Sequence, residues 1–208
     1  KQAVIEVGGY KTNTIGEDME IVVRLHSYMR KNKRKYKVIF CEDAVCWTQG
    51  PMKLKDIRGQ RRRWQIGLLD TLVSHKNLLF NPRYGAVGLV AVPYNWIFEL
   101  LGAVIEALGY FIIPFSLIMG ELNIFFFVIY FLLATLLGIM LSIGSLILEQ
   151  YTKKSAMTAK QYILISVYAI LENFGYRQLI TLFRVEGIIK YRKLRQTWGK
   201  IERKEFEQ

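Results

Sequence analysis

Residues 54–74 read LKDIRGQRRRWQIGLLDTLVS, a run that predicts one long basic helix. Gln60, Arg63 and Trp64 would lie on one face of this helix, because side chains three and four positions apart are neighbours on a helix surface. The planar guanidinium of Arg63 can bind a pair of phosphate oxygens, and an indole offers a flat apolar surface beside it. A second interpretation, an anchor at a membrane interface, stays open because Trp and Arg are both common at that depth.

Two acids precede this helix, in the string Gly16-Glu17-Asp18. We expect Asp18 to open a helix of its own, since Met19 and Val22 begin an apolar stripe with helical spacing. A carboxylate at a helix start is favoured in its ionised form by the positive end of the helix dipole. Taken alone, Asp18 would be interpreted as a helix-capping acid, because short acids are common at that position.

Three short segments rich in β-branched and aromatic side chains predict strands, namely residues 4–7, 36–41 and 45–48. The first of them should close into a turn at the adjacent glycines that follow it. Residues 31–35 are a run of charge that should lie in solvent and end the preceding helix. Residues 77–83 are expected to form a loop closed by a proline.

The most apolar part of the chain is residues 122–148, which contain no charged side chain. At about 1.5 Å per residue they would form a helix of about 40 Å, enough to cross a hydrocarbon core of about 30 Å with some tilt. Residues 84–120 are too long for one straight crossing and too short for two, so we predict an interfacial piece ending near Pro93 and a crossing near 94–119. Polar side chains interrupt residues 161–183, so this third segment is predicted to be partly inserted or to return to the same side.

One stripe of the predicted helix over 94–119 is polar or small and consists of Asn95, Glu99, Gly102, Glu106 and Gly109. A carboxylate near the centre of a bilayer costs about 2.5 to 3.5 kcal/mol, so the stripe should face protein or water. Two interpretations remain open. The glycines can allow close packing of another helix, or the stripe can form one wall of a polar conduit.

The chain has 208 residues, of which 52% are hydrophobic, and a formal net charge of +12. This combination fits neither a disordered chain nor an ordinary soluble domain. The basic residues flank the apolar segments, and no nucleic-acid-reading motif accompanies them, so membrane lipids are expected partners and nucleic acid is not. The last basic stretch, residues 184–208, is expected to be an amphipathic tail on the inner membrane surface.

Cys41 and Cys46 are the only cysteines, and no second pair is present to complete a metal site. We expect a reduced pair that packs as small apolar residues. His26 and His75 stand apart from each other and are interpreted as structural.

Taken together, the two motifs resemble the paired signatures of the processive, membrane-embedded family 2 glycosyltransferases, which are relatives of cellulose, hyaluronan and poly-N-acetylglucosamine synthases. In that family an acid motif of the form (T/G)-E-D precedes a Q-x-x-R-W motif by several tens of residues. Here the string at residues 16–18 precedes the string at residues 60–64 in the same order. The resemblance continues through residues 45–51 and 81–84 into the apolar segments, and so covers nearly the whole chain.

The resemblance implies an α/β fold in which residues 1–83 form the acceptor half of a GT-A-like cytosolic catalytic domain. An α-helical transmembrane region, residues 84–183, would follow. Members of that family begin with a nucleotide-binding half that carries D-x-D metal-binding acids, and no such segment precedes Lys1. We therefore expect a carboxy-terminal part that is inactive alone and holds no metal, with Mg²⁺ or Mn²⁺ bound by the missing amino-terminal half.

The resemblance also assigns roles to the motif residues. Asp18 corresponds to the general base that accepts a proton from the acceptor hydroxyl, and Glu17 supports the site. Gln60, Arg63 and Trp64 would bind the diphosphate and the acceptor. The other two arginines of the run, at positions 61 and 62, lie elsewhere on the helix and are expected to meet lipid headgroups.

The resulting hypothesis is an inverting transfer of a sugar from a nucleotide-diphosphate sugar to a glycan or lipid-linked acceptor, as part of polysaccharide synthesis. The protein would be a multi-pass plasma-membrane protein with its catalytic part in the cytosol, and its polar stripe would line a conduit for the nascent polysaccharide. Two alternatives stay open. One is a non-catalytic membrane transport or scaffold subunit, and the other is a transferase that adds a single sugar to a lipid-linked acceptor.

Overall fold

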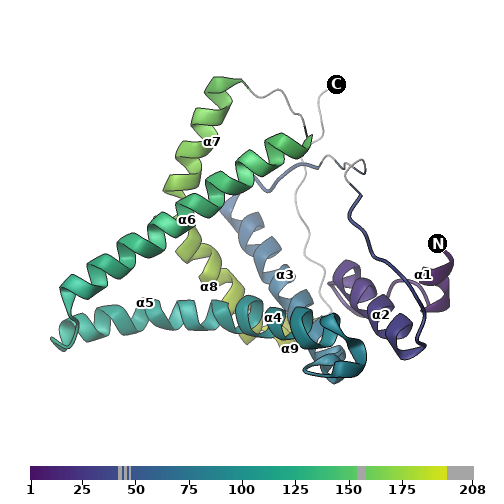
Figure 1. Ribbon diagram of the computed structural model, residues 1–208. Coiled ribbons are helices and arrows are strands. Elements are labelled where there is room, and N and C mark those ends of the chain that lie inside the picture. Colours follow the sequence, from purple (N-terminus) through teal and green to yellow (C-terminus); the bar gives the residue numbers. More distant parts are fainter. Residues whose placement is uncertain (42–43, 45, 47, 154–157, 196–208) are drawn as a thin grey trace. The chain divides into compact units, whose positions relative to one another are not determined.

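The computed structural model describes residues 1–41, 44, 46, 48–153 and 158–195 (Figure 1). The chain divides into two compact units. The first unit combines Lys1–Ile39, Trp47–Glu106 and Thr181–Gln208, and the second combines Phe40–Cys46 and Ala107–Ile180. The motif residues at positions 16–18 and 60–64 therefore belong to the same unit.

Helices account for all the regular structure in the described residues. The elements up to the first apolar helix are α1 (Gln2–Glu6), α2 (Glu17–Lys31), α3 (Leu54–Ser74), η1 (Lys76–Leu78) and η2 (Pro82–Tyr84). The first apolar helix consists of η3 (Val87–Ala91), α4 (Val92–Tyr94), η4 (Asn95–Leu101) and α5 (Gly102–Ile118). The remaining helices are α6 (Ile124–Lys153), α7 (Ala159–Leu171), α8 (Tyr176–Ile189) and α9 (Tyr191–Leu194).

The predicted α/β fold class is wrong for the described residues, which contain no strand or sheet. Residues 36–41 run without regular structure, although their composition favours a strand. The physical reason is that a strand exists only when its backbone N–H and C=O groups bond to a neighbouring strand, and no described segment offers one. The predicted strand at 45–48 falls partly outside the described residues.

Residues 4–7 form a short helix and its end, where the sequence predicts a strand. The amide of Ile5 donates to the carbonyl of Lys1 at 3.2 Å, so local bonds replace the absent sheet. The predicted turn that follows is confirmed, because Gly8 and Gly9 have φ angles of 85° and 71°, in the left-handed region that glycine tolerates.

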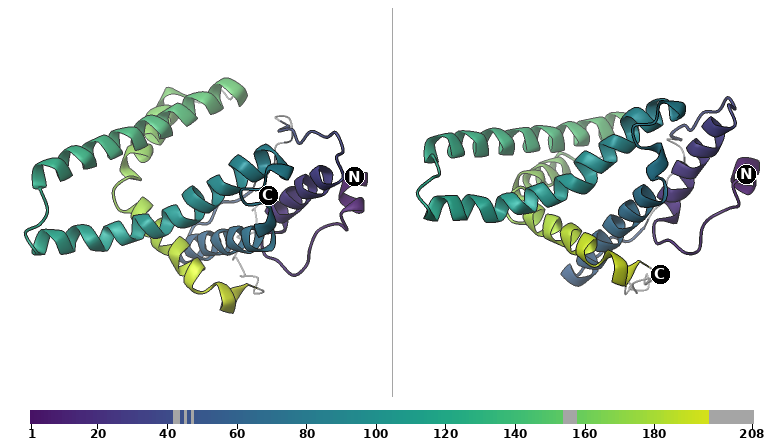
Figure 2. Two further views of the ribbon diagram at one scale, coloured as in Figure 1. Left: turned by 60° about the horizontal axis from the view of Figure 1, so that its bottom comes forward. Right: turned by 90° about the horizontal axis from the view of Figure 1, so that it is seen from below.

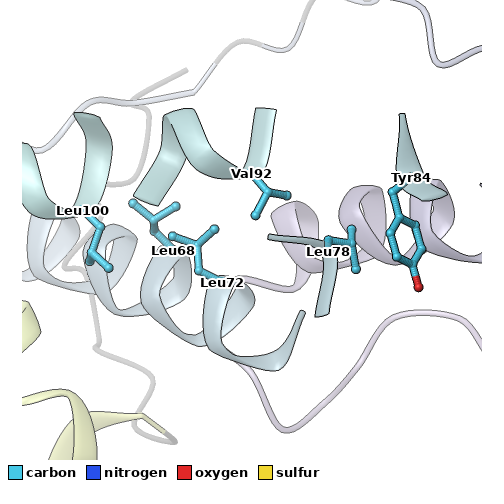
Figure 3. Close-up of a cluster of buried hydrophobic side chains, with 6 residues drawn as sticks. All are labelled: Leu68, Leu72, Leu78, Tyr84, Val92 and Leu100. Carbon is cyan, nitrogen blue, oxygen red and sulfur yellow. The ribbon is translucent and has the colours of Figure 1, made fainter. Parts of the chain in front are cut away.

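Helix α3 has the bounds that the sequence predicts, Leu54–Ser74, and its second half forms the core of the first unit. Leu68 and Leu72, one turn apart on α3, pack against apolar side chains of the elements that follow it (Figure 3). These partners are Leu78, Tyr84, Val92 and Leu100. The first turns of the apolar helix are therefore packed onto the helix that carries the Q-x-x-R-W motif.

The end of α8 and helix α9 also lie against α3, which they cross at an angle in both views of Figure 2. A Cβ built on Gly187 of α8 would lie 2.8 Å from the carbonyl oxygen of Arg62, so glycine is needed for this approach. Buried Asp70 of α3 accepts a hydrogen bond of 2.7 Å from the hydroxyl of Tyr191. It also forms an ion pair with Arg195, again at 2.7 Å. The start of the predicted basic tail is thus docked on α3, whereas residues 196–208 lie outside the described part.

Two described helices are long and apolar enough to cross a membrane, Val87–Ile118 and Ile124–Leu148. Only 11% of the apolar window of the first and none of that of the second is buried, which is unlike the core helix of a soluble protein. The first helix runs through Pro93 without a break. Proline has no amide hydrogen to donate within the helix. The segment just before it, Val87–Ala91, has π-type bonding, a local change of the bonding pattern that keeps the helix continuous.

The third apolar segment is divided into α7 and α8. Thr158 and Gln161 form a reciprocal capping box at the start of α7, and the φ of Gly175, 92°, marks the break before α8. Within the second unit, α7 packs on α6, and Ser142 donates to Glu172 at 2.8 Å. At 13 residues, α7 is shorter than the two membrane-length helices.

Candidate functional site

The two sequence motifs are brought together by a contact between two glycines. A Cβ built on Gly16 would lie 2.7 Å from the Cα of Gly67, and one built on Gly67 would lie 2.9 Å from the Cα of Gly16. No side chain fits between the backbones, so the start of α2 lies directly against α3 at this point. Gly67 was not singled out from the sequence, and the only available signal was its position three residues after Trp64.

The acids lie in the first turn of α2, immediately after this contact. Gly16 is the N-cap and Glu17 the first helical residue, so the capping interpretation of Asp18 does not describe its place. Asp18 is exposed, and its Oδ1 accepts a hydrogen bond of 2.8 Å from the amide of Met19. Its carboxylate therefore lies at the positive end of the helix dipole and is open to solvent.

The Q-x-x-R-W face of α3 points in part to solvent. Gln60 and Arg63 are half-buried, and Trp64 is 52% exposed. Gly67 continues the same face, because it lies three positions after Trp64 and four after Arg63. Since Gly67 touches Gly16, the face that carries the motif leads directly to the first turn of α2.

The neighbouring arginines are held by protein groups. The guanidinium of Arg61 stacks over the Trp64 ring at 4.7 Å from the ring centroid, which covers one face of the indole. Arg62 donates to Glu186 of α8 at 3.3 Å. Helix α8 thus supplies a carboxylate partner for Arg62 that the helical pattern of α3 alone does not reveal, and the contact of these arginines with lipid headgroups stays a prediction.

A buried carboxylate near the site, Glu20, was missed from the sequence. Glu20 is 1% exposed and is surrounded by Lys11 at 2.9 Å, Arg24 at 3.0 Å and the imidazole of His75 at 3.0 Å. Arg24 also donates to the carbonyl of Gly9 at 2.5 Å. The cluster therefore ties the loop before α2, α2 itself and the end of α3 to one another.

The ionisation of Glu20 follows from these partners. Burial alone would raise the pKa of this carboxyl, but hydrogen bonds from Lys11, His75 and Arg24 favour the charged form and hold the pKa below its ordinary value. A glutamate four residues before an arginine on the same helix looks like one half of a surface ion pair in the sequence. Only the approach of α3, with His75 at its end, encloses it.

A second ionic cluster joins α3 to α8. Glu186 accepts two hydrogen bonds from Arg58, at 2.7 and 2.9 Å, and further bonds from Arg62 and Lys190. The hydrogen bonds from Arg58, acting against partial burial, lower the pKa of Glu186 to about 2. This cluster fixes the first half of α3, which carries Gln60, Arg63 and Trp64.

The polar stripe of the first apolar helix is partly explained. Arg184 of α8 donates to the carbonyl and to the carboxylate of Glu99, the latter at 3.2 Å, and to Gln65 of α3 at 2.9 Å. By contrast, no described atom outside the local helix backbone lies within 3.4 Å of a Cβ built on Gly102 or Gly109. Packing of a helix through these glycines is therefore not seen among the described residues.

The cysteines and His26 also have defined surroundings. Cys41 and Cys46 are free and exposed, so the prediction that they pack as apolar residues is wrong. The Nδ1 of His26 lies 2.7 Å from the hydroxyl of Tyr36. Burial, with a smaller effect of Arg30, lowers the pKa of His26, which favours the neutral ring.

No group of three or more His, Cys, Asp and Glu side chains in the described part of the chain could hold a metal ion. Asp18 is exposed, and the buried Glu20 is already neutralised by cations. The described residues therefore do not fit the divalent metal that the resemblance implies.

Residues 1–144 match the family model described as "Glycosyl transferase family group 2". The matched range contains α2 and α3 with both motifs, the whole first apolar helix and most of α6. No curated protein and no solved structure matches the chain.

Proposed function

The chain belongs to glycosyl transferase family group 2, and from that premise we propose that it carries the acceptor side of a membrane-bound sugar transferase. The reaction is the transfer of a sugar from a nucleotide-diphosphate sugar to a hydroxyl of a glycan or lipid-linked acceptor. With inversion, this is a single displacement at the anomeric carbon, which needs one general base and a means of stabilising the departing diphosphate.

Asp18 is the proposed base. Its carboxylate takes the proton of the acceptor hydroxyl while that oxygen bonds to the anomeric carbon and the bond from this carbon to the diphosphate breaks. Three features support this role: its exposure, its place at the positive end of α2 and the contact of the preceding glycine with α3. Glu17 is proposed to support the site from the adjacent position.

Gln60, Arg63 and Trp64 are proposed to bind the diphosphate and the acceptor. The guanidinium fork can bind two oxygens of a phosphate, and the half-exposed indole offers an apolar surface for the C–H face of a pyranose ring. The stack of Arg61 on Trp64 supports this role, because it restrains the ring and adds positive charge beside it.

A divalent metal, Mg²⁺ or Mn²⁺, belongs to the proposal only as a counter-charge for the diphosphate. Its ligands are placed outside the described residues, since these offer no suitable cluster. No step of the transfer is assigned to a metal held by this chain.

The membrane location is proposed from the two apolar helices after α3. Their exposed apolar surfaces favour a protein that crosses the membrane more than once. The basic residues that flank them favour the cytosolic side of the plasma membrane for the catalytic groups. Polysaccharide synthesis is the proposed role, with single-sugar transfer to a lipid-linked acceptor as the variant that differs in product length.

The observation that carries the proposal is the contact between Gly16 and Gly67, because it joins the acid motif to the Q-x-x-R-W face. The test is Asp18→Asn in membranes that contain the complete protein, with incorporation of labelled sugar as the measurement. Removal of a general base should lower turnover by about 10²-fold or more, since base catalysis contributes about 10²- to 10⁴-fold. Membrane insertion should be unchanged.

The matched control is Glu121→Gln, which removes one exposed carboxylate in the turn after the first apolar helix. We expect this variant to keep the turnover of the wild type. Turnover of Asp18→Asn within about twofold of the control would eliminate Asp18 as the base.

A second test concerns the guanidinium of the Q-x-x-R-W motif. Arg63→Lys keeps the charge but removes the planar fork, so turnover should fall by at least about tenfold. Arg192→Lys, an exposed arginine of α9, is the control. Equal turnover and nucleotide-release rates in both variants would contradict the proposed contact between Arg63 and the diphosphate.

A further inference from the structure

A basic pocket of about 460 Å³ lies in the first unit, away from the Gly16–Gly67 contact. It is formed where the end of α2 and the segment after it meet η2. The lining residues are Arg30, Lys33, Arg34, Lys35, Tyr36 and Arg83. Every lining side chain except that of Tyr36 is cationic, and no carboxylate lines the pocket.

The backbone at the end of α2 gathers these cations. Helix α2 ends because Lys33 adopts a φ of 53°, in the left-handed region, and the amide of Arg34 then bonds back to the carbonyl of Met29 at 2.9 Å. The chain therefore reverses within a charge run that the sequence presents as a simple solvated stretch. Consecutive basic side chains are brought to one side of the helix end.

The aromatic residue of the pocket is fixed by its neighbours. The hydroxyl of Tyr36 is within 2.7 Å of His26, and the guanidinium of Arg30 stacks over the Tyr36 ring at 5.8 Å. The same guanidinium lies against Gly85, where a Cβ would approach its Cζ to 3.3 Å. Arg30 is thus held between the tyrosine ring and the backbone that follows η2.

Most of the positive charge in the pocket is not neutralised by the protein. Arg34 pairs with Glu6, but no described carboxylate pairs with Lys33, Lys35 or Arg83. Like charges gathered at this spacing repel one another, and a bound anion would reverse that cost. The pocket therefore has the charge and the volume that a phosphate-bearing ligand requires.

The pocket also has a defined place along the chain. Arg83 comes four residues before Val87, where the first helix of membrane length begins. Basic residues at the end of a membrane helix lie at the depth of lipid phosphates. At this depth the pocket is accessible both to a lipid headgroup and to a soluble phosphate compound.

We propose that this pocket binds a phosphate-bearing anion, through Lys33, Lys35 and Arg83 together with the stacked Arg30. The ligand chemistry is a phosphate group with at least one further negative charge or polar substituent, supplied by an anionic lipid or by a soluble phosphate compound. The site is separate from the proposed transfer chemistry and does not depend on it.

The test compares a pocket variant with a charge-matched control in the complete chain, purified in uncharged detergent. The pocket variant is Lys33→Gln, Lys35→Gln and Arg83→Gln combined. The control is Lys1→Gln, Lys76→Gln and Arg192→Gln combined, which removes the same charge from exposed positions outside the pocket. Circular dichroism of both variants checks that the helices are retained.

Two probes distinguish the sources of the phosphate. Inorganic pyrophosphate is titrated by calorimetry, and retention of phosphatidic acid is measured by native mass spectrometry, with phosphatidylcholine as the neutral lipid. We expect the pocket variant to bind one or both anionic probes at least about tenfold more weakly than the control, since three of the cations that attract the phosphate are removed.

Loss of pyrophosphate binding alone identifies a soluble ligand, and loss of phosphatidic acid retention alone identifies a lipid. Loss of binding of both probes identifies a site that recognises the phosphate group itself. Equal binding of both probes by the pocket variant and the control would overturn the proposal, because net charge rather than the pocket would then account for the affinity.

Discussion

Two carboxylates in the first turns of α2, Asp18 and Glu20, are two residues apart and have opposite surroundings. Asp18 is exposed and accepts one backbone hydrogen bond, whereas Glu20 is 1% exposed and is surrounded by two cations and an imidazole. The difference comes from α3, which lies against one side of α2 and leaves the other open. One helix start therefore provides a group available for chemistry and a group that holds the helix in place.

The comparison teaches that acid residues close in sequence need not share a role. Buried carboxylates are retained only when cations and hydrogen bonds compensate for their lost hydration, and removing such a group leaves those cations unpaired. An exposed carboxylate contributes little to stability but can meet a substrate. Asp18 and Glu20 are thus expected to separate activity from stability when each is changed.

The largest expected effect on stability follows from Glu20→Gln. This change leaves Lys11, Arg24 and His75 without their shared carboxylate, so the free energy of unfolding should fall by about 3 kcal/mol. Asp18→Asn should change it by less than about 0.5 kcal/mol, as for other exposed positions. Urea titration of both variants in uncharged detergent, followed by circular dichroism, measures the difference.

An equal loss of stability in the two variants would break the comparison. It would mean that Asp18 is also a structural group, and the interpretation of its loss of activity would change accordingly.

A smaller effect on stability is expected when α2 and α3 are pushed apart at their contact. Gly67→Ala places a Cβ 2.9 Å from the Cα of Gly16, so one backbone must move, at a cost of about 1 to 3 kcal/mol. Because the shift displaces Asp18 from the Q-x-x-R-W face, turnover should fall by about 10²-fold. Sugar incorporation and urea titration give the two values.

Gly59→Ala, on the same helix, is the matched control. Among the described residues, no atom outside the local helix backbone lies within 4 Å of a Cβ built there, and alanine favours the helix over glycine by about 1 kcal/mol. This variant should keep its turnover and gain slightly in stability. If Gly67→Ala behaved in the same way, the contact between Gly16 and Gly67 would not position the acid motif.

The smallest expected effect concerns Glu186, whose surroundings are intermediate between those of Asp18 and Glu20. Its pKa is lowered from 4.5 to about 2, so the folded state holds this proton less tightly than the unfolded state. The stabilisation is therefore complete above the unfolded value and is lost as pH falls from about 4.5 toward about 2. Its size should be about 1 kcal/mol, because the Arg58 partner is half exposed.

Glu186→Gln should remove this part of the pH dependence. Unfolding free energies measured near pH 6 and near pH 3 should differ less in the variant than in the wild type, and Glu121→Gln serves as the control with an exposed carboxylate. If the unfolding free energy of Glu186→Gln depended on pH as strongly as that of the wild type, the ion pairs of α3 with α8 would contribute nothing to stability.

Much of the fold was predictable where periodicity alone decides structure. The bounds of α3, the helix that begins at the acid motif and the two apolar helices all follow from patterns within one segment. The strands predicted at residues 4–7 and 36–41 failed for a different reason: a strand depends on a partner elsewhere in the chain, which composition does not reveal. The same limit applies to Arg62, whose partner Glu186 on α8 the helical pattern of α3 alone does not reveal.

For the candidate site, too, some features follow from the sequence and others only from tertiary contacts. The residue types of the two motifs and their order are properties of the sequence, since acid, amide, guanidinium and indole carry their chemistry with them. What only the tertiary structure decided is that Gly16 lies against Gly67, that Glu20 is enclosed by Lys11, Arg24 and His75, and that a basic pocket forms at the end of α2. Each of these depends on contacts between segments far apart in sequence, because burial and charge pairing are set by what packs on a helix and not by the helix itself.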